Sequence, residues 1–340
     1  MKKWILAFVF LVLVLGLFLG WKLLGPVTQA PEGKYFYIAT GATYNEVKKE
    51  LTAKKVLRGT FWFDWLAKKM DYPSLVKPGR YLIPPRTSLL QLVRMLRNGR
   101  QSPVNLVISR RIRVREDLVK LMKDKFEFSA DDMNSFLASN DSLKKYGLDT
   151  AGFTLAIFPD TYQFFWNTTP RKVYDRLWEE STKYWTPEKV AKARAKGLTI
   201  LEAHVLASVV EEETNYGPEK PTIASVYLNR VAKGIPLQAD PTVKFALRDF
   251  GLRRIYFKHL QVASPYNTYR NKGLPPGPIC NVQKSTLDAV LDAPKTDYIY
   301  FVANSDFSGS HVFSAEDVTH MKLARQYQLA LDSLQKAKQK

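Results

Sequence analysis

An uncharged, strongly apolar run near the N-terminus constrains this chain more than any other feature. Lys2 and Lys3 precede an uncharged stretch from Trp4 to Trp21 that is rich in Leu, Val and Phe. At 1.5 Å per residue, a helix over this stretch is about 27 Å long, close to the thickness of the hydrocarbon core of a bilayer. A cleaved signal peptide is the alternative, but its apolar region is shorter, roughly 7–15 residues, and a small-residue cleavage site follows it. The sequence therefore predicts an uncleaved membrane anchor within residues 1–24.

The flanking charges predict how this anchor is oriented. The positive-inside rule places Lys2 and Lys3 in the cytoplasm and residues 25–340 outside it. No second apolar run of spanning length follows in the sequence. We therefore expect a single-pass protein of the inner or plasma membrane, with an extracytoplasmic (periplasmic) C-terminal part. Such a part has no access to cytosolic nucleotide substrates, which excludes many enzyme classes.

The charge balance favours an anionic partner. The chain has 51 Lys and Arg residues against 32 Asp and Glu residues, a net charge of +19, which suits lipid headgroups, an acidic polymer or nucleic acid. No basic run is interleaved with stacking aromatic residues, which argues against nucleic acid. The single cysteine, Cys280, excludes an intrachain disulfide, and four scattered histidines give no metal-site spacing. We expect neither a metal nor a cofactor.

Local sequence patterns predict a mixed α+β fold in two parts. After a linker at 25–33, strand patterns occur at Tyr35–Ala39 and Gly79–Ile83, and capping boxes begin helices after Thr43 and Ser88. With a further helix near residues 60–70, residues 34–103 form a small α+β unit of order β-α-α-β-α. A larger mixed α+β domain is expected over residues 104–340.

One predicted helix in the larger domain ends in three carboxylates. Ala203–Val210 is almost entirely apolar and is followed by Glu211, Glu212 and Glu213. A carboxyl group beside an apolar wall has a raised pKa and can donate a proton near neutral pH. A solvated acidic helix end is the plain alternative, although acidic groups are disfavoured at a helix C-terminus. Because successive positions point about 100° apart, Glu211 and Glu213 are the candidates and Glu212 is expected to face water.

Amide, carboxylate and aromatic side chains follow this helix in sequence. Gln238 and Asp240 would lie on the same side of an extended segment and could grip sugar hydroxyl groups. Asp240 precedes a proline, so a plain turn is the alternative interpretation. Tyr266 and Asn267 add a ring and an amide that suit sugar binding. The residue types together indicate glycosidic bond chemistry, in which a protonated carboxyl group acts on the leaving oxygen.

The ordered set of motifs resembles the YceG-like (MltG) family of endolytic murein transglycosylases. The segments that carry the resemblance are Phe158–Tyr162, Ala207–Thr214, Asn229-Arg230, Gln238–Val243, Tyr266–Tyr269, Gly273–Gly277 and Tyr300–Ala303. The resemblance covers about residues 30–335. It implies a LysM-like module at 34–103 and a catalytic domain at 104–340. It also implies a catalytic glutamate that opens a Glu-x-Glu-Thr motif, which falls on Glu211.

The resemblance implies the reaction of a lytic transglycosylase. Glu211 would protonate the oxygen between N-acetylmuramic acid and N-acetylglucosamine and then act as base toward the C6 hydroxyl group, which leaves a 1,6-anhydro end. One carboxylate suffices because the attack is intramolecular. The residues expected to bind the substrate or to support the acid are Glu213, Asn229, Gln238, Asp240, Tyr266 and Asn267.

The same resemblance names the expected partners, and two other functions stay open. The partners are (nascent) peptidoglycan glycan strands, the membrane and peptidoglycan synthases, with no nucleic acid. The first alternative is a muramidase-type hydrolase that uses Glu211 with Asp240. The second is a non-catalytic scaffold that binds peptidoglycan through the LysM-like module.

Overall fold

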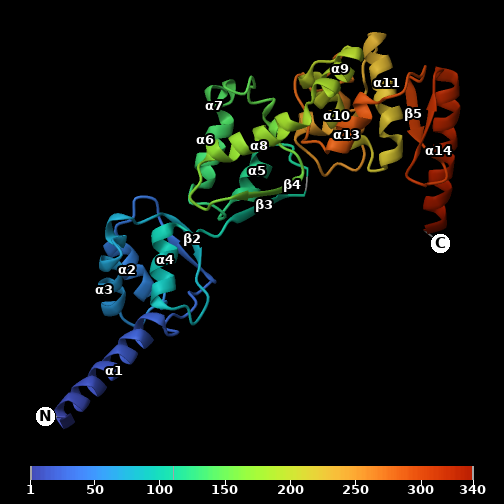
Figure 1. Cartoon of the computed structure of the whole chain (residues 1–340). Helices are drawn as coiled ribbons and strands as arrows, with labels where there is room; N and C mark the ends of the chain where they lie inside the picture. The colour runs from blue at the N-terminus through green and yellow to red at the C-terminus, as the bar shows by residue number, and fades with distance from the viewer. Residues whose placement is uncertain (1, 110, 339–340) are drawn as a thin grey trace. The chain divides into compact units, whose positions relative to one another are not determined.

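The computed structural model describes residues 2–109 and 111–338. Met1 of the expected anchor and residues 339–340 of the expected 104–340 domain lie outside the described residues, as does Arg110. Helices predominate in the described residues, and the short strands there form three two-stranded sheets (Figure 1). The expected mixed α+β class is confirmed. The chain forms two compact units: residues 1–106 with 122–130 and 162–169, and residues 107–121 with 131–161 and 170–340.

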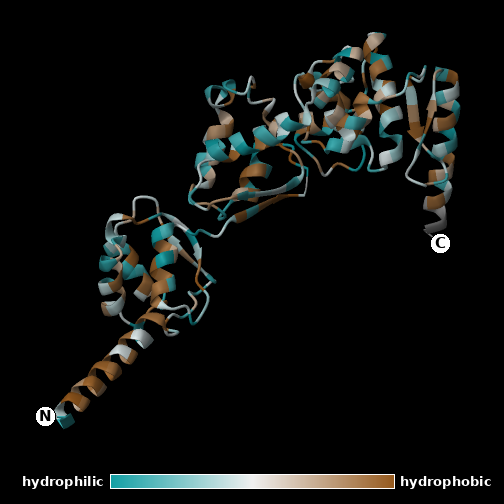
Figure 2. Cartoon of the chain, in the orientation of Figure 1, coloured by the Kyte–Doolittle hydropathy of each residue, from teal (hydrophilic) through white to brown (hydrophobic). Residues whose placement is uncertain are grey.

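The N-terminal helix matches the expected anchor in extent and composition. Helix α1 covers Lys2–Leu24, has no acidic residue in its first turn and buries none of its side chains within the protein. It is brown along most of its length in Figure 2, where brown marks hydrophobic residues. By length and composition it can cross a membrane.

The first compact unit has the element order that the sequence predicts. Its elements are β1 (Tyr35–Ile38), α2 (Tyr44–Ala53), α3 (Phe61–Lys69), a 3₁₀ turn η1 (Tyr72–Ser74), β2 (Gly79–Leu82) and α4 (Leu89–Asn98). Both predicted capping boxes form, at Thr43 and at Ser88. Strands β1 and β2 pair antiparallel, with Tyr35 opposite Leu82 and Ile38 opposite Gly79. The strands and helices enclose a separate core that includes Phe63 and Leu92.

The next elements along the chain connect the first unit to α10. They are β3 (Val104–Ile108), α5 (Arg115–Met122), α6 (Ala130–Ala138), α7 (Asn140–Lys144), η2 (Phe153–Ala156), β4 (Asp160–Phe164), α8 (Pro170–Tyr184) and α9 (Pro187–Ala195). Strand β3 pairs with β4. Helices α8 and α9 begin at the prolines that the sequence places at their first positions, where a missing N–H costs no hydrogen bond.

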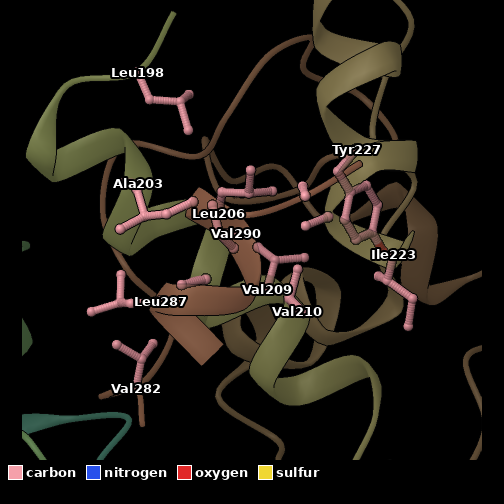
Figure 3. Close-up of a cluster of buried hydrophobic side chains, with 14 of the residues drawn as sticks. Leu198, Ala203, Leu206, Val209, Val210, Ile223, Tyr227, Val282, Leu287 and Val290 are labelled. Atoms are coloured by element: carbon pink, nitrogen blue, oxygen red, sulfur yellow. The ribbon is translucent and has the colours of Figure 1, made fainter. Parts of the chain in front are cut away.

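Helix α10 (Ile200–Glu213) lies at the centre of the second core. A capping box at Thr199 begins it, and every residue from Ala203 to Glu211 is buried. Helix α10 contacts α11 (Lys220–Ala232), α12 (Asp240–Leu247) and α13 (Lys284–Leu291). Figure 3 shows side chains of α10, α11 and α13 meeting in one apolar cluster. A helix that is apolar on nearly every side is buried in this way because no face of it suits water.

The chain ends in a hairpin covered by a long helix. Strands β5 (Tyr300–Ala303) and β6 (His311–Ser314) pair antiparallel, and α14 (Asp317–Lys338) contacts both of them. A short 3₁₀ turn, η3 (Gly217–Glu219), precedes α11, and another, η4 (His259–Gln261), follows α12. These elements surround the C-terminal end of α10, where the three glutamates lie.

Candidate active site

The three glutamates at the end of α10 enter three different environments, as their helical spacing predicts. Glu211 points into the protein interior and is 3% exposed. Glu212 contacts two arginines, and Glu213 lines a cleft. The candidate site is therefore defined by which of these carboxyl groups a substrate can reach.

Glu211 is fully engaged by neighbouring side chains. Its Oε2 lies 2.9 Å from Lys220 Nζ and also accepts a hydrogen bond from the Thr286 hydroxyl group. Gln283 donates to its Oε1 at 3.3 Å, and an Arg111 nitrogen lies 4.0 Å from the same oxygen. Lys220 is itself buried, so this is an interior ion pair. The pair links α10 to α11, and Thr286 of α13 hydrogen-bonds to both of its members.

Glu212 does not face water, contrary to the prediction. Arg113 binds it in a bidentate manner, with distances of 2.7 and 3.0 Å from its Nε and NH2 atoms to the two carboxylate oxygens. Arg111 lies 3.6 Å from the same carboxylate, whose side chain is only 12% exposed. Local sequence patterns do not predict this contact, because both arginines lie about 100 residues earlier.

Glu213 lines a cleft of about 440 Å³, whereas Glu212 lines a smaller cavity of about 230 Å³ together with its two arginines. Tyr227 of α11 donates its hydroxyl hydrogen to Glu213 Oε1 over 2.5 Å. Burial raises the pKa of Glu213 to about 7, with a smaller contribution from the negative charge of Asp240. A carboxyl group with this pKa is largely protonated just below neutral pH and can donate a proton. The other described residues that line the cleft are Tyr227, Arg230, Leu237, Gln238, Asp240, Tyr269, Tyr300, Phe301, Asp317 and His320.

The structure brings Gln238 and Asp240 to this cleft, but not along an extended segment. Asp240 begins α12, with Pro241 in the first turn. The expectation of an extended segment or a plain turn was wrong, because Pro also suits the first turn of a helix. Asp240 Oδ1 accepts a hydrogen bond from Tyr269 at 2.6 Å. Gln238 has φ of +54°, a left-handed conformation that non-glycine residues rarely adopt.

Arg230 lines the cleft and hydrogen-bonds to three segments around it. Its Nε donates to Pro236 O at 2.9 Å and its NH1 donates to Ile299 O at 2.8 Å. Its NH2 donates to the Gln238 side-chain oxygen. The guanidinium group therefore fixes α11, the loop after it, the start of β5 and Gln238 in one arrangement. Burial lowers the pKa of Arg230, whose normal value is so high that it stays charged.

The remaining predicted site residues do not line the cleft. Asn229 donates to the backbone oxygens of Thr296 and Tyr298 at 2.9 and 2.8 Å. Asn267 is completely buried and donates to the backbone oxygens of Leu260 and Val262. The Tyr266 ring packs against Phe245, with a centroid distance of 4.6 Å. These three side chains contact protein segments near the cleft, so their positions fit a supporting role.

A second hydrogen-bond network anchors the residue after Glu213. Thr214 donates to Glu219 Oε1 at 2.7 Å, and His311 Nδ1 lies 2.8 Å from the same oxygen. The backbone N–H of His311 donates to Glu219 Oε2 at 2.9 Å. Helix α10 is thereby joined at its C-terminal end to η3 and to β6. His204 of α10 lies outside this network: it accepts a hydrogen bond from Trp185, and burial lowers its pKa to about 3.

Several cleft residues were not singled out from the sequence. The hydroxyl contact of Tyr227 to Glu213 follows only from three-dimensional packing. Arg230 and Tyr269 lie in the segments Asn229-Arg230 and Tyr266–Tyr269, in which the sequence analysis favours Asn229 and Asn267 instead. His320, whose ring stacks on Tyr300 at 4.8 Å, comes from the C-terminal helix, which carries no motif.

The comparisons with known proteins place this arrangement in a family. The sequence profile of the YceG-like family matches residues 36–326, which is most of the chain. The chain therefore belongs to the YceG-like family. A crystal structure of a Listeria monocytogenes protein described as YceG-like is similar to this fold, with a TM-score of 0.57 and 25% sequence identity. The similarity covers 86% of this chain and 99% of that one.

Curated relatives carry a specific name. The chain is 36% identical over 171 residues to an endolytic murein transglycosylase of Bacillus subtilis, covering 50% of this chain and 47% of that protein. It is 30% identical over 152 residues to an endolytic murein transglycosylase of Streptococcus pneumoniae serotype 2, covering 44% of this chain and 27% of that protein. The matched part thus spans about half or less of the length of these relatives.

Proposed function

We propose that this protein is an endolytic lytic transglycosylase of peptidoglycan. It would cleave the bond between N-acetylmuramic acid and N-acetylglucosamine within a glycan strand and leave a 1,6-anhydro end. The observation that carries the proposal is Glu213, a carboxyl group with a pKa raised to about 7 at the wall of a polar cleft. Membership of the YceG-like family and the names of the curated relatives support the same reaction.

The geometry favours Glu213 over Glu211 as the acid. The sequence assigned the role to Glu211, and that assignment stays a prediction. The Glu211 carboxylate already contacts Lys220, Thr286 and Gln283 inside the protein and is not among the residues that line the cleft. Glu213 has a single side-chain donor, Tyr227, and shares the cleft with Gln238 and Asp240. A general acid must come within hydrogen-bond reach of the leaving oxygen, and Glu213 meets this requirement better.

The proposed reaction needs one carboxyl group and no water. Protonated Glu213 donates its proton to the oxygen that bridges the two sugars, and the bond from that oxygen to C1 of the muramyl residue breaks. The C6 hydroxyl oxygen of the same residue then forms a bond to C1, and its proton returns to Glu213. The attack is intramolecular, so the nucleophile is already in place. Tyr227 orients the acid, while Gln238 and Asp240 are suited to hold sugar hydroxyl groups.

A hydrolase is the second candidate function, and the position of Asp240 favours it. Asp240 lines the same cleft as Glu213, and its charge raises the pKa of Glu213. A second carboxylate could activate water or attack C1, as in muramidases. The hydrogen bond from Tyr269 to Asp240 fits either role. Hydrolysis leaves a reducing end, whereas the transglycosylase leaves an anhydro end.

The location and the accessory parts belong to the same proposal. We assign α1 as a single membrane anchor with a cytoplasmic N-terminus, which leaves both compact units outside the cytoplasm. Residues 34–103 would serve as a LysM-like module that contacts glycan, with residues 104–340 as the catalytic domain. An anchored enzyme would meet strands as they are synthesised, so peptidoglycan synthases are the expected partners. A scaffold without activity would keep only the glycan contact.

Mass spectrometry of digested glycan strands tests the proposal. The full chain in detergent is incubated with purified peptidoglycan, in parallel with Glu213→Gln, Glu211→Gln and Asp240→Asn. We expect anhydro-muramyl products from the unmodified chain and a loss of about 10²–10⁴-fold in rate for Glu213→Gln, the usual contribution of a general acid. Full activity of folded Glu213→Gln together with an inactive, folded Glu211→Gln would restore Glu211 as the acid. Reducing-end products that depend on Asp240 would favour the hydrolase.

A further inference from the structure

Exposed aromatic side chains gather at the start of α3. Phe61 is 72% exposed and Trp65 is 44% exposed, and Trp62 lies between them. The ring centroids of Phe61 and Trp62 are 5.2 Å apart, and those of Trp62 and Trp65 are 6.5 Å apart. We refer to these three residues as the α3 aromatic cluster. Contiguous exposed apolar side chains of this size usually mark an interaction surface.

The α3 aromatic cluster lies beside the end of α1. The Trp62 ring meets Phe18 of α1 edge to face, with centroids 6.3 Å apart. Leu23 of the same helix packs against the core of the first unit. A cavity of about 660 Å³ opens here, with Trp21, Lys22, Phe61 and Trp62 among its lining residues. The aromatic surface is therefore continuous with the last turns of α1.

Backbone hydrogen bonds keep the first unit at the end of α1. The N–H groups of Val27 and Thr28 donate to Thr87 O at 3.4 and 3.2 Å, and the N–H of Gln29 donates to Val56 O at 3.0 Å. Residues 25–33 are thus bound to the unit over at least part of their length. Only Gly25 and Pro26 lie between Leu24 and Val27, and three extended residue steps span at most about 10 Å. Wherever α1 leaves the hydrocarbon, the unit is close to the membrane surface.

The same surface is cationic. Lys22 Nζ lies 5.4 Å from the centroid of the Phe18 ring and 5.2 Å from that of Trp21. Arg58 is exposed and lines the cavity, whose described lining residues include no carboxylate. Asp64, the acidic residue on α3, is held by Lys68 at 2.7 Å and by Lys48 at 3.2 Å. Aromatic rings beside basic groups are typical of the membrane–water interface, and basic groups there are attracted to an anionic leaflet.

We propose that the α3 aromatic cluster docks into the headgroup region of an anionic bilayer, with Lys22 and Arg58 against the lipid phosphates. The inference rests on the proposed insertion of α1. It gives the first unit a second attachment to the membrane besides the helix. Docking limits the directions in which the chain beyond this unit can extend from the membrane surface. A glycan strand is the competing occupant, because sugars also stack on exposed rings.

Fluorescence quenching in the full chain tests the docking. Phe61→Cys is labelled with an environment-sensitive fluorophore, and the chain is reconstituted in nanodiscs that contain phosphatidylglycerol and lipids with a nitroxide near the headgroup. The control is Asn45→Cys, exposed on α2 near the Ile38 end of the strand pair, away from residues 25–33. Leu13→Cys, within α1, reports whether that helix is inserted. Cys280 is buried, and the unmodified chain carried through labelling gives the background.

The outcomes separate the docking from the anchor. We expect several-fold stronger quenching at residue 61 than at residue 45, together with strong quenching of a deep nitroxide probe at residue 13. Equal, weak quenching at 61 and 45 with residue 13 in the hydrocarbon would overturn the docking and keep the anchor. Weak quenching at all three positions would overturn both. Protection of residue 61 by soluble glycan fragments, without lipid quenching, would assign the surface to glycan instead.

A charge-reversal pair tests the anionic part of the proposal. Arg58→Glu should lower the quenching at residue 61 several-fold in phosphatidylglycerol nanodiscs, because it places a carboxylate against lipid phosphates. Lys49 is an exposed residue of α2 and does not line the cavity. Lys49→Glu makes the same change of charge and should leave the quenching unchanged. Equal quenching in phosphatidylcholine and phosphatidylglycerol, with no effect of Arg58→Glu, would remove the anionic lipid from the proposal.

Discussion

At the scale of single residues, the two outer glutamates of α10 differ in what holds them. Glu211 is the acidic member of a buried ion pair, whereas Glu213 has one hydroxyl donor and a raised pKa. Although they are only two residues apart, Glu211 lies in a buried ion pair and Glu213 lies in the wall of a cleft. This difference leads to opposite effects on stability when each is replaced.

Replacing Glu213 should stabilise the protein at alkaline pH. Its folded-state pKa is about 7 against a usual value of 4.5, so folding favours the protonated form. The stability from this group is complete below about pH 4.5 and is lost as the pH rises through 7. At 1.36 kcal/mol per pKa unit the loss is roughly 3 kcal/mol above pH 8. Glu213→Gln keeps an acceptor for Tyr227 and avoids the buried charge.

Thermal unfolding of Glu213→Gln and of the unmodified chain checks this prediction. The variant should have the higher midpoint at pH 8, and the difference should shrink toward pH 5. Glu188→Gln makes the same change at a carboxylate of α9 that is 77% exposed and lies outside the cleft lining, so it is the matched control. A difference between Glu213→Gln and the unmodified chain that is independent of pH would contradict a raised pKa at Glu213.

Glu211 and Lys220 should behave as a coupled pair. Glu211→Leu leaves the buried Lys220 ammonium without its carboxylate, and Lys220→Met leaves the buried carboxylate without its ammonium. Each single change should cost about 3–5 kcal/mol, whereas the double variant should cost much less than their sum. Chemical denaturation of the four proteins measures the coupling. Strictly additive costs would mean that the 2.9 Å contact contributes nothing to stability.

At the scale of elements, the turn into α12 carries a local conformational cost. Gln238 adopts φ of +54°, its N–H donates to Thr268 O at 3.1 Å, and α12 begins two residues later. A left-handed conformation costs a residue with a Cβ roughly 1–2 kcal/mol, and glycine avoids this cost. The turn keeps this conformation because Thr268 and Arg230 hold Gln238 from two sides.

Two substitutions at Gln238 separate backbone strain from side-chain function. Gln238→Gly and Gln238→Ala both remove the contact to Arg230, so both should lower activity on glycan strands. The glycine variant should be more stable than the alanine variant by about 1 kcal/mol, because only alanine retains the strain. Denaturation midpoints of the two proteins give the comparison. A more stable alanine variant would indicate that the turn relaxes to a negative φ in solution.

The elements were largely predictable from the sequence, and the contacts between them were not. Capping boxes at Thr43, Ser88 and Thr199 mark helix starts with side chains only three residues apart, so local chemistry determines them. Helix α12 was missed because Asp-Pro suits both a turn and a helix start. The distinction between Glu211 and Glu213 depends on partners 9 to 100 residues away, such as Lys220 and Arg111. No local pattern encodes which partner a helix face will meet.

At the scale of the whole molecule, two apolar cores of the described residues belong to different compact units. One core lies in the first compact unit and includes Phe63 and Leu92, and the other surrounds α10 and includes Val290. Each of these cores contains residues that are completely buried. If each core supports its own unit, a cavity made in one should weaken that unit alone, since stability is distributed in local cooperative regions.

Paired core truncations test this independence. Leu92→Ala in α4 and Val290→Ala in α13 each remove completely buried methyl groups, and the leucine change should cost about 2–5 kcal/mol. Hydrogen exchange measured segment by segment on the full chain should show faster exchange in β2 and α4 for Leu92→Ala, with α10 unaffected. Val290→Ala should give the reverse pattern and, because α13 packs on α10, should also reduce activity on glycan. Faster exchange across both units in either variant would mean that the two cores unfold as one, and the first unit could not then dock on a membrane independently of the cleft that Glu213 lines.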